Sequence, residues 1–154
     1  HAALRDVLGA KTGEMPVQAG SNVNANMLTF DFTHREAMSA DEIEMVQKRV
    51  NAEAEKSLNV SVMEMGLDEA TSRGAMAHFE DRYEDSSKVR VVEIGDGVSS
   101  ELCCGTHVSN TSDVYPFLVL HERSVALGTS LSSFILFHHE VLTQTYQVHD
   151  VSKP

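Results

Sequence analysis

The feature that most constrains the fold is one amphipathic helix, predicted over residues 40–57, among short segments with the pattern of strands. Ser39 precedes it and Glu42 lies three residues further on, which is the capping-box pattern that begins a helix. Apolar residues recur at steps of three and four among charged neighbours: Ile43, Val46, Val50 and Ala54. A helix with one apolar stripe packs on another layer, here a sheet.

The rest of the chain alternates between short helical and extended patterns. Residues 1–8 have helical spacing with Gly9 as a stop, and residues 10–20 are expected to form a loop that leads into a strand. A short helix is expected from Asp68, ended by Gly74. Alternating or valine-rich runs predict strands at residues 27–33, 59–65, 88–94, 100–104, 117–121 and 133–137. The combination predicts an α+β domain, with a mostly antiparallel sheet packed with helices.

Length and charge exclude several classes of protein. A chain of 154 residues is the size of one domain. Twelve Lys and Arg against 23 Asp and Glu give a net charge of −11, which excludes binding of DNA by bulk electrostatics but leaves contact with a short stretch of RNA. No run reaches the roughly 18 apolar residues that span a bilayer, so no membrane partner is expected. The adjacent Cys103 and Cys104 favour a reducing compartment, and a cytoplasmic location is expected, with an organelle as the alternative.

The segment at residues 101–107 carries the clearest chemistry. Cys103 and His107 stand four positions apart, and Gly105 between them allows a tight turn. A thiolate and an imidazole that converge in this way suit Zn²⁺, which usually takes three or four protein ligands, and the pair supplies two. On spacing alone, a buried cysteine near an unrelated histidine is the commoner explanation.

Several motifs, in order, resemble a known family. Residues 101–110 resemble the Cys-Gly-Gly-Thr-His segment of the alanyl-tRNA synthetase editing domain. Residues 1–9 resemble the helix after that family's first metal motif, and residues 18–34 resemble its Gln-x-Gly-Ser and Arg-Phe-Asp-Phe-Thr-His block. Residues 74–77 and 89–95 match as well. The similarity covers residues 1–128 and predicts a domain there, followed by a divergent tail at residues 129–154.

The resemblance implies zinc-dependent hydrolysis of the ester of mischarged tRNA(Ala), which removes serine or glycine. Cys103 and His107 would be zinc ligands, and Gly105 and Thr106 would line the pocket for the terminal adenosine and the aminoacyl group. Gln18 matches a glutamine close to the family's editing site, although it also suits a polar turn before Gly20. Cys103, Gln18 and Thr106 are the expected catalytic set. The expected partners are the acceptor end of tRNA(Ala) and the rest of an alanyl-tRNA synthetase.

Two further zinc ligands come, in the family, from a His-x-x-x-His motif. The chain begins on His1, just past the place of that motif, so an N-terminally truncated domain is expected. The other available histidines are His1, which is the most interesting replacement, and His34, His78, His121, His138 and His139. Each of them is more simply read as an ordinary core or surface histidine.

Departures from the family pattern leave other functions open. Cys104 stands where the family usually has glycine, and residues 128–132 lack its paired arginines, a loss that would weaken phosphate contacts. A catalytically inert module, acting as a scaffold or weak acceptor-stem binder, is therefore the main alternative. A third is an unrelated zinc hydrolase built on the histidines near the C-terminus: His121, His138, His139 and His149.

Overall fold

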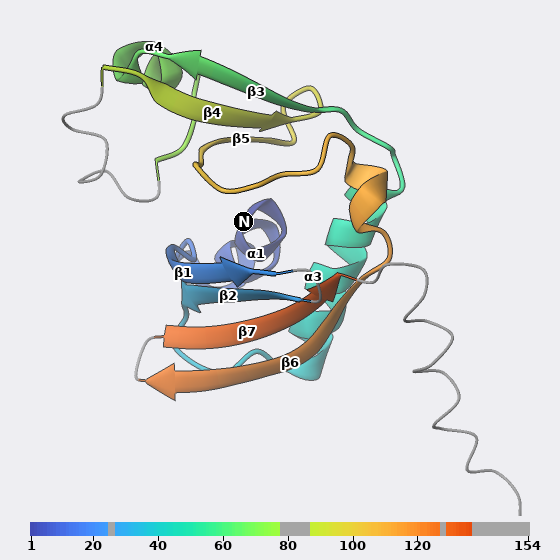
Figure 1. Ribbon diagram of the computed structural model, residues 1–154. Helices are drawn as coiled ribbons and strands as arrows, with labels where there is room; N and C mark the ends of the chain where they lie inside the picture. Colours follow the sequence, from blue (N-terminus) through green and yellow to red (C-terminus); the bar gives the residue numbers. More distant parts are fainter. Residues whose placement is uncertain (25–26, 78–86, 127–128, 137–154) are drawn as a thin grey trace, which may run out of the picture.

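Two antiparallel sheets and the helical segments packed against them form the structure (Figure 1). The computed structural model describes residues 1–24, 27–77, 87–126 and 129–136. The larger sheet has the order β1-β2-β7-β6 and the smaller one β3-β4-β5. The strands of the larger sheet are β1 (Gln18–Val23), β2 (Leu28–Thr33), β6 (Phe117–Ala126) and β7 (Thr129–Leu136), and those of the smaller are β3 (Val60–Met65), β4 (Val89–Ile94) and β5 (Ser99–Leu102). The predicted α+β class is confirmed, since every pair of strands within the two described sheets is antiparallel.

The predicted amphipathic helix is α3 (Ala40–Ala54), and its capping box is confirmed. Ser39 accepts a hydrogen bond from the backbone N–H of Glu42, and the Glu42 carboxylate accepts one from the backbone N–H of Ser39. The helix ends at Ala54, three residues before the end of the predicted range 40–57. The hydroxyl of Thr111 lies 3.2 Å from the carbonyl oxygen of Glu53 and 3.3 Å from that of Ala54, so a side chain from a distant segment takes up helix-end carbonyls.

Two apolar clusters lie on the two sheets. The larger one joins the N-terminal helix, α3 and the larger sheet through Ala3, Leu4, Leu8, Phe30, Phe32, Met38, Val46 and Phe117. The smaller one packs α4 (Leu67–Ser72) on one face of the smaller sheet through Met65, Ala70, Ala75, Val89, Val91 and Leu102. The expected alternation along β2 is confirmed by the burial of Phe30 and Phe32 on the same face.

The N-terminal helix continues past Gly9, so the prediction of a stop there was wrong. It runs through α1 (Ala2–Leu4), a π-helical turn η1 (Arg5–Gly9) and α2 (Ala10–Thr12), and ends at Gly13, whose φ of 72° is left-handed. Gly9 serves close packing instead, because a β-carbon built on it would lie 2.8 Å from the sulfur of Met15. Gly13 is the glycine that ends the helix by its backbone conformation.

Strand β7 occupies an inner position of the larger sheet. It falls within residues 129–154, and it pairs with β2 on one side and β6 on the other. Both β6 and β7 are longer than the alternating runs predicted; Phe137 lies outside the described residues. Among the described residues, no helix has the length and apolar content to cross a membrane.

Candidate functional site

A cavity of about 280 Å³ lies between the smaller sheet, the N-terminal helix and α3. In Figure 1 the N-terminus and α1 lie between the smaller sheet and strands β1 and β2, and α3 runs beside α1 and the larger sheet. The apolar walls of the cavity come from Ala2, Ala3, Val50, Ala54, Val92, Ile94, Val98 and Val114. Its polar lining comes from His1, Arg49, Glu53, Ser99, Glu101, Cys103, His107 and Thr111. The cavity therefore combines a small apolar chamber with a few convergent polar groups, as ligand sites do.

Alternation along β5 and the residue after it selects the side chains of this cavity. Ser99, Glu101 and Cys103 line it, whereas Leu102 belongs to the apolar cluster on the opposite face of the sheet. On the neighbouring strand β4, Val92 pairs with Glu101 and lines the same cavity. One face of the smaller sheet thus packs in the apolar cluster, and the other lines the cavity.

Cys103 and His107 come together as predicted. Cys103 is half-buried, and its hydrogen bond with the His107 side chain lowers the pKa of the thiol against the opposing effect of burial. The same bond raises the pKa of His107. Nδ1 of His107 lies 2.9 Å from the carbonyl oxygen of Gly105, so the backbone between the two residues also fixes the imidazole ring.

Arg90 holds this turn from the neighbouring strand β4. Its Nη1 donates to the carbonyl oxygens of Cys103 and Gly105, at 2.5 and 3.0 Å. The backbone N–H of Cys103 donates in return to the carbonyl oxygen of Arg90, at 3.1 Å. The Cys103–His107 turn is therefore clamped to the sheet by a guanidinium group, which the sequence reasoning did not identify.

The side chains at this turn are of the types that bind zinc, but Cys103 and His107 supply only two of the three or four protein ligands that a zinc site usually has. A thiol and an imidazole are zinc donors, and a hydrogen bond from one ring nitrogen to a backbone carbonyl is the usual second contact of a metal-bound histidine. Nδ1 of His107 makes that contact with Gly105, which leaves Nε2 as the nitrogen for a metal. Within the described ranges, no three His, Cys, Asp or Glu side chains are grouped so as to hold a metal ion.

The proposed replacement histidines do not complete this pair in the described structure. His1 lines the cavity, but its ring nitrogens contact Glu101 and Gln18. His34 lines a separate cavity beside Arg35, and His121 is exposed on β6. The other histidines named from the sequence lie outside the described residues: His78, His138, His139 and His149.

The remaining predicted site residues do not line the cavity. Gln18 begins strand β1 rather than forming a turn, and its side chain contacts His1 and Ser21. Gly105 and Thr106 are exposed in the turn between Cys103 and His107. Cys104 is exposed, whereas Cys103 faces the cavity.

Three residues of the candidate site were not predicted from the sequence: His1 as a hydrogen-bonding group, Arg90 and Glu101. Glu101 gave the clearest signal, because a carboxylate in a strand between buried positions needs a partner. It is only 8% exposed and follows Ser99 at the two-residue spacing that places both side chains on one face.

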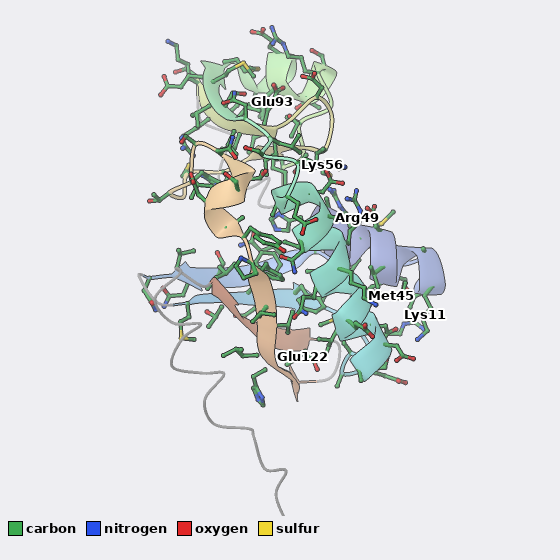
Figure 2. The ribbon with its side chains drawn as sticks, turned by 90° about the vertical axis from the view of Figure 1, so that its right-hand side faces the viewer. Lys11, Met45, Arg49, Lys56, Glu93 and Glu122 are labelled. Atoms are coloured by element: carbon green, nitrogen blue, oxygen red, sulfur yellow. The ribbon has the colours of Figure 1, made fainter. Side chains whose placement is uncertain are left out.

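Along α3, charged contacts fix the helix that forms one wall of the cavity. Nε of Arg49 lies 3.0 Å from Oδ2 of Asp6 on η1, and Nζ of Lys11 lies 2.6 Å from Oε1 of Glu42. Figure 2 shows Arg49 and Lys11 where the N-terminal helix lies beside α3. These contacts hold the N-terminal helix, and with it His1, beside α3.

The sequence is similar to known proteins over most of its length. The family described as the threonyl and alanyl tRNA synthetase second additional domain matches residues 89–130, which include β4, β5 and the Cys103–His107 turn. An alanine–tRNA ligase of Nitrosomonas eutropha (strain DSM 101675 / C91 / Nm57) is 46% identical over 128 residues, or 83% of this chain. The chain spans 14% of the length of that relative. The chain thus belongs to the editing-type domains of the alanyl-tRNA synthetase family.

Proposed function

We propose that this domain hydrolyses the ester of seryl- or glycyl-tRNA(Ala) and so supports the fidelity of alanyl-tRNA synthesis in the cytoplasm. The observation that carries the proposal is the convergence of Cys103 and His107 on a small cavity in a domain of this family. The acceptor end of tRNA(Ala) is the proposed partner, and the proposed setting is a longer synthetase. A second hydrolytic site is the usual remedy where binding alone cannot reject a near-isostere such as serine for alanine.

The proposed chemistry asks little of the protein beyond positioning. An aminoacyl ester is already activated, so an oriented water molecule and a fixed carbonyl suffice for its hydrolysis. The apolar walls would limit the size of the aminoacyl group, and polar side chains of the cavity would form hydrogen bonds with its ammonium and hydroxyl groups. Zinc held by Cys103, His107 and further ligands would supply polarisation of the water or an anchor for the substrate.

One observation favours a second candidate, an inert module of the same fold that acts as a scaffold or weak acceptor-stem binder. Within the described ranges, Cys103 and His107 have no third metal-binding side chain beside them. The net charge of −11 also opposes RNA binding over an extended surface.

Deacylation of seryl-tRNA(Ala), with and without a chelator, separates the two functions. The hydrolytic function predicts loss of serine from this tRNA and not of alanine from alanyl-tRNA(Ala). It also predicts that Cys103→Ala abolishes the activity and that Cys104→Ala, beside it but exposed, retains it. Equal rates for the Cys103→Ala and unmodified chains, or hydrolysis of both tRNAs alike, would reject the proposal in favour of the inert module or a non-specific esterase.

A further inference from the structure

A chain of polar side chains runs from the smaller sheet, past the wall of the cavity, to the larger sheet. On the smaller sheet, Oε2 of Glu101 contacts Nδ1 of His1, at the start of the N-terminal helix. On the far side of the ring, Nε2 of His1 lies 3.0 Å from Oε1 of Gln18, the first residue of β1 in the larger sheet. We call Glu101, His1 and Gln18 the cavity bridge.

Each side chain of the cavity bridge is held in more than one way. The Glu101 carboxylate accepts a hydrogen bond from Oγ of Ser99 at 2.8 Å through its other oxygen. The imidazole of His1 also packs edge-on against the core ring of Phe30, with 4.7 Å between the ring centroids. Nε2 of Gln18 donates to Oγ of Ser21 at 3.0 Å, so its amide oxygen faces His1.

This arrangement determines what His1 does. Both of its ring nitrogens are engaged, Nδ1 with the Glu101 carboxylate and Nε2 with the Gln18 side chain. A histidine that activates water or a nucleophile needs one nitrogen that accepts a proton from it. Nε2 is instead engaged with Gln18, which marks His1 as a connecting group rather than a general base.

The cavity bridge joins the two halves of the candidate site. Cys103 directly follows β5, two residues after Glu101 on the same face of the smaller sheet, whereas Gln18 belongs to the larger sheet. The described strands of the two sheets do not pair with one another. The cavity bridge is therefore a polar connection between the parts of the structure that carry Cys103 and Gln18.

We infer that His1 and Glu101 are positioning residues, which fix the Gln18 amide relative to Cys103. The inference rests on the proposed function, because it assigns Gln18 a part in the hydrolysis of seryl-tRNA(Ala). A displaced group near the reacting bond costs up to about a hundredfold in rate, even when the displaced residue is not touched by the mutation itself.

The activity test uses His1→Asn, which retains a donor near the place of Nδ1 but cannot reach Gln18. We expect kcat for seryl-tRNA(Ala) to fall by about tenfold or more while KM stays within about twofold. His121→Asn, on an exposed histidine of β6, is the matched control. Glu101→Gln still presents an oxygen to Nδ1 of His1 and should retain most of kcat. Glu101→Leu presents no such oxygen, and its kcat should fall as that of His1→Asn does.

A double-mutant cycle distinguishes positioning from general structural damage. If His1 acts through Gln18, the double variant His1→Asn/Gln18→Ala is no slower than Gln18→Ala alone. Multiplied losses, or a His1→Asn chain as fast as the unmodified one, would overturn the positioning role.

A spectroscopic readout keeps this test independent of activity. In the full chain labelled with ¹⁵N, His1→Asn should move the side-chain amide resonances of Gln18 and the backbone amide of Cys103, and His121→Asn should move neither. Unmoved resonances would overturn the cavity bridge itself. An unmodified chain that fails to hydrolyse seryl-tRNA(Ala), while these resonances do respond, would reject the proposed function and support the bridge as a structural connection.

Discussion

Replacement of Glu42 by glutamine tests how the N-terminal helix is tied to α3. The Glu42 side chain is 10% exposed, and one of its oxygens lies 2.6 Å from Nζ of Lys11. The other oxygen accepts from the backbone N–H and the hydroxyl of Ser39, at 2.7 and 2.8 Å. Chiefly through the hydrogen bond from Lys11, and then that from the Ser39 backbone, the pKa of Glu42 is lowered from 4.5 to about 2.

The magnitude follows from that lowered pKa. The difference between 4.5 and about 2 corresponds to about 3 kcal/mol of folding free energy at about 1.4 kcal/mol per pKa unit. Lys11 is 66% exposed, so solvent screening reduces the net contribution to about 1–2 kcal/mol. Because the folded state lowers the pKa, the contribution is complete above the unfolded value of 4.5 and disappears as the pH falls toward 2.

The assay is urea unfolding, followed by circular dichroism, between pH 7 and pH 2. Glu42→Gln should lower the free energy of unfolding by about 1–2 kcal/mol at pH 7, and the difference from the unmodified chain should shrink as the pH falls below 4.5. Glu44→Gln, which removes the exposed pair with Lys48 on the same helix, should change it by less than about 0.5 kcal/mol. A Glu42→Gln deficit that stays constant down to pH 2, or that grows on acidification, would refute the reasoning.

Two further substitutions test the frame of the site. Lysine in place of Arg90 cannot donate to the carbonyl oxygens of Cys103 and Gly105 with the same geometry. Amide hydrogen exchange in that turn should therefore accelerate by about tenfold in Arg90→Lys. An unchanged exchange rate would contradict the role of Arg90 in holding the turn. Thr111→Val removes a hydroxyl that accepts a hydrogen bond from the backbone N–H of Leu58 at 2.8 Å and donates one to the carbonyl of Ala54 at the end of α3. The free energy of unfolding in urea should fall by about 1–3 kcal/mol. A decrease below about 0.5 kcal/mol would contradict that role.

Local patterns predicted local structure well. The capping box of α3 and the alternation of Phe30 and Phe32 depend on residues a few positions apart, and both are confirmed. The end of the first helix was missed because Gly9 and Gly13 look alike in sequence. Only the packing of Met15 against Gly9 and the left-handed backbone at Gly13 separate their roles.

Connections between distant segments account for what the sequence did not reveal. The place of β7 between β2 and β6 depends on the order of strands in a sheet, which alternation does not encode. In the site, Cys103 and His107 were predicted together because one turn brings them together. His1 and Glu101 lie far apart in the sequence, and no local spacing relates them.

The polarity of the cavity bridge is difficult to explain by stability alone. Glu101 pairs across the sheet with buried Val92 and precedes buried Leu102, so an apolar residue there would avoid the cost of removing a carboxylate from water. Buried ionic groups can often be replaced by well-packed apolar ones without loss of stability, yet here the carboxylate is held by Ser99 and His1 beside Cys103. Residues that depart from the local pattern and are held by several partners are typical of functional sites, and Glu101 is such a residue. Its partners Ser99 and His1 line the same cavity, so Glu101 lies within the candidate site.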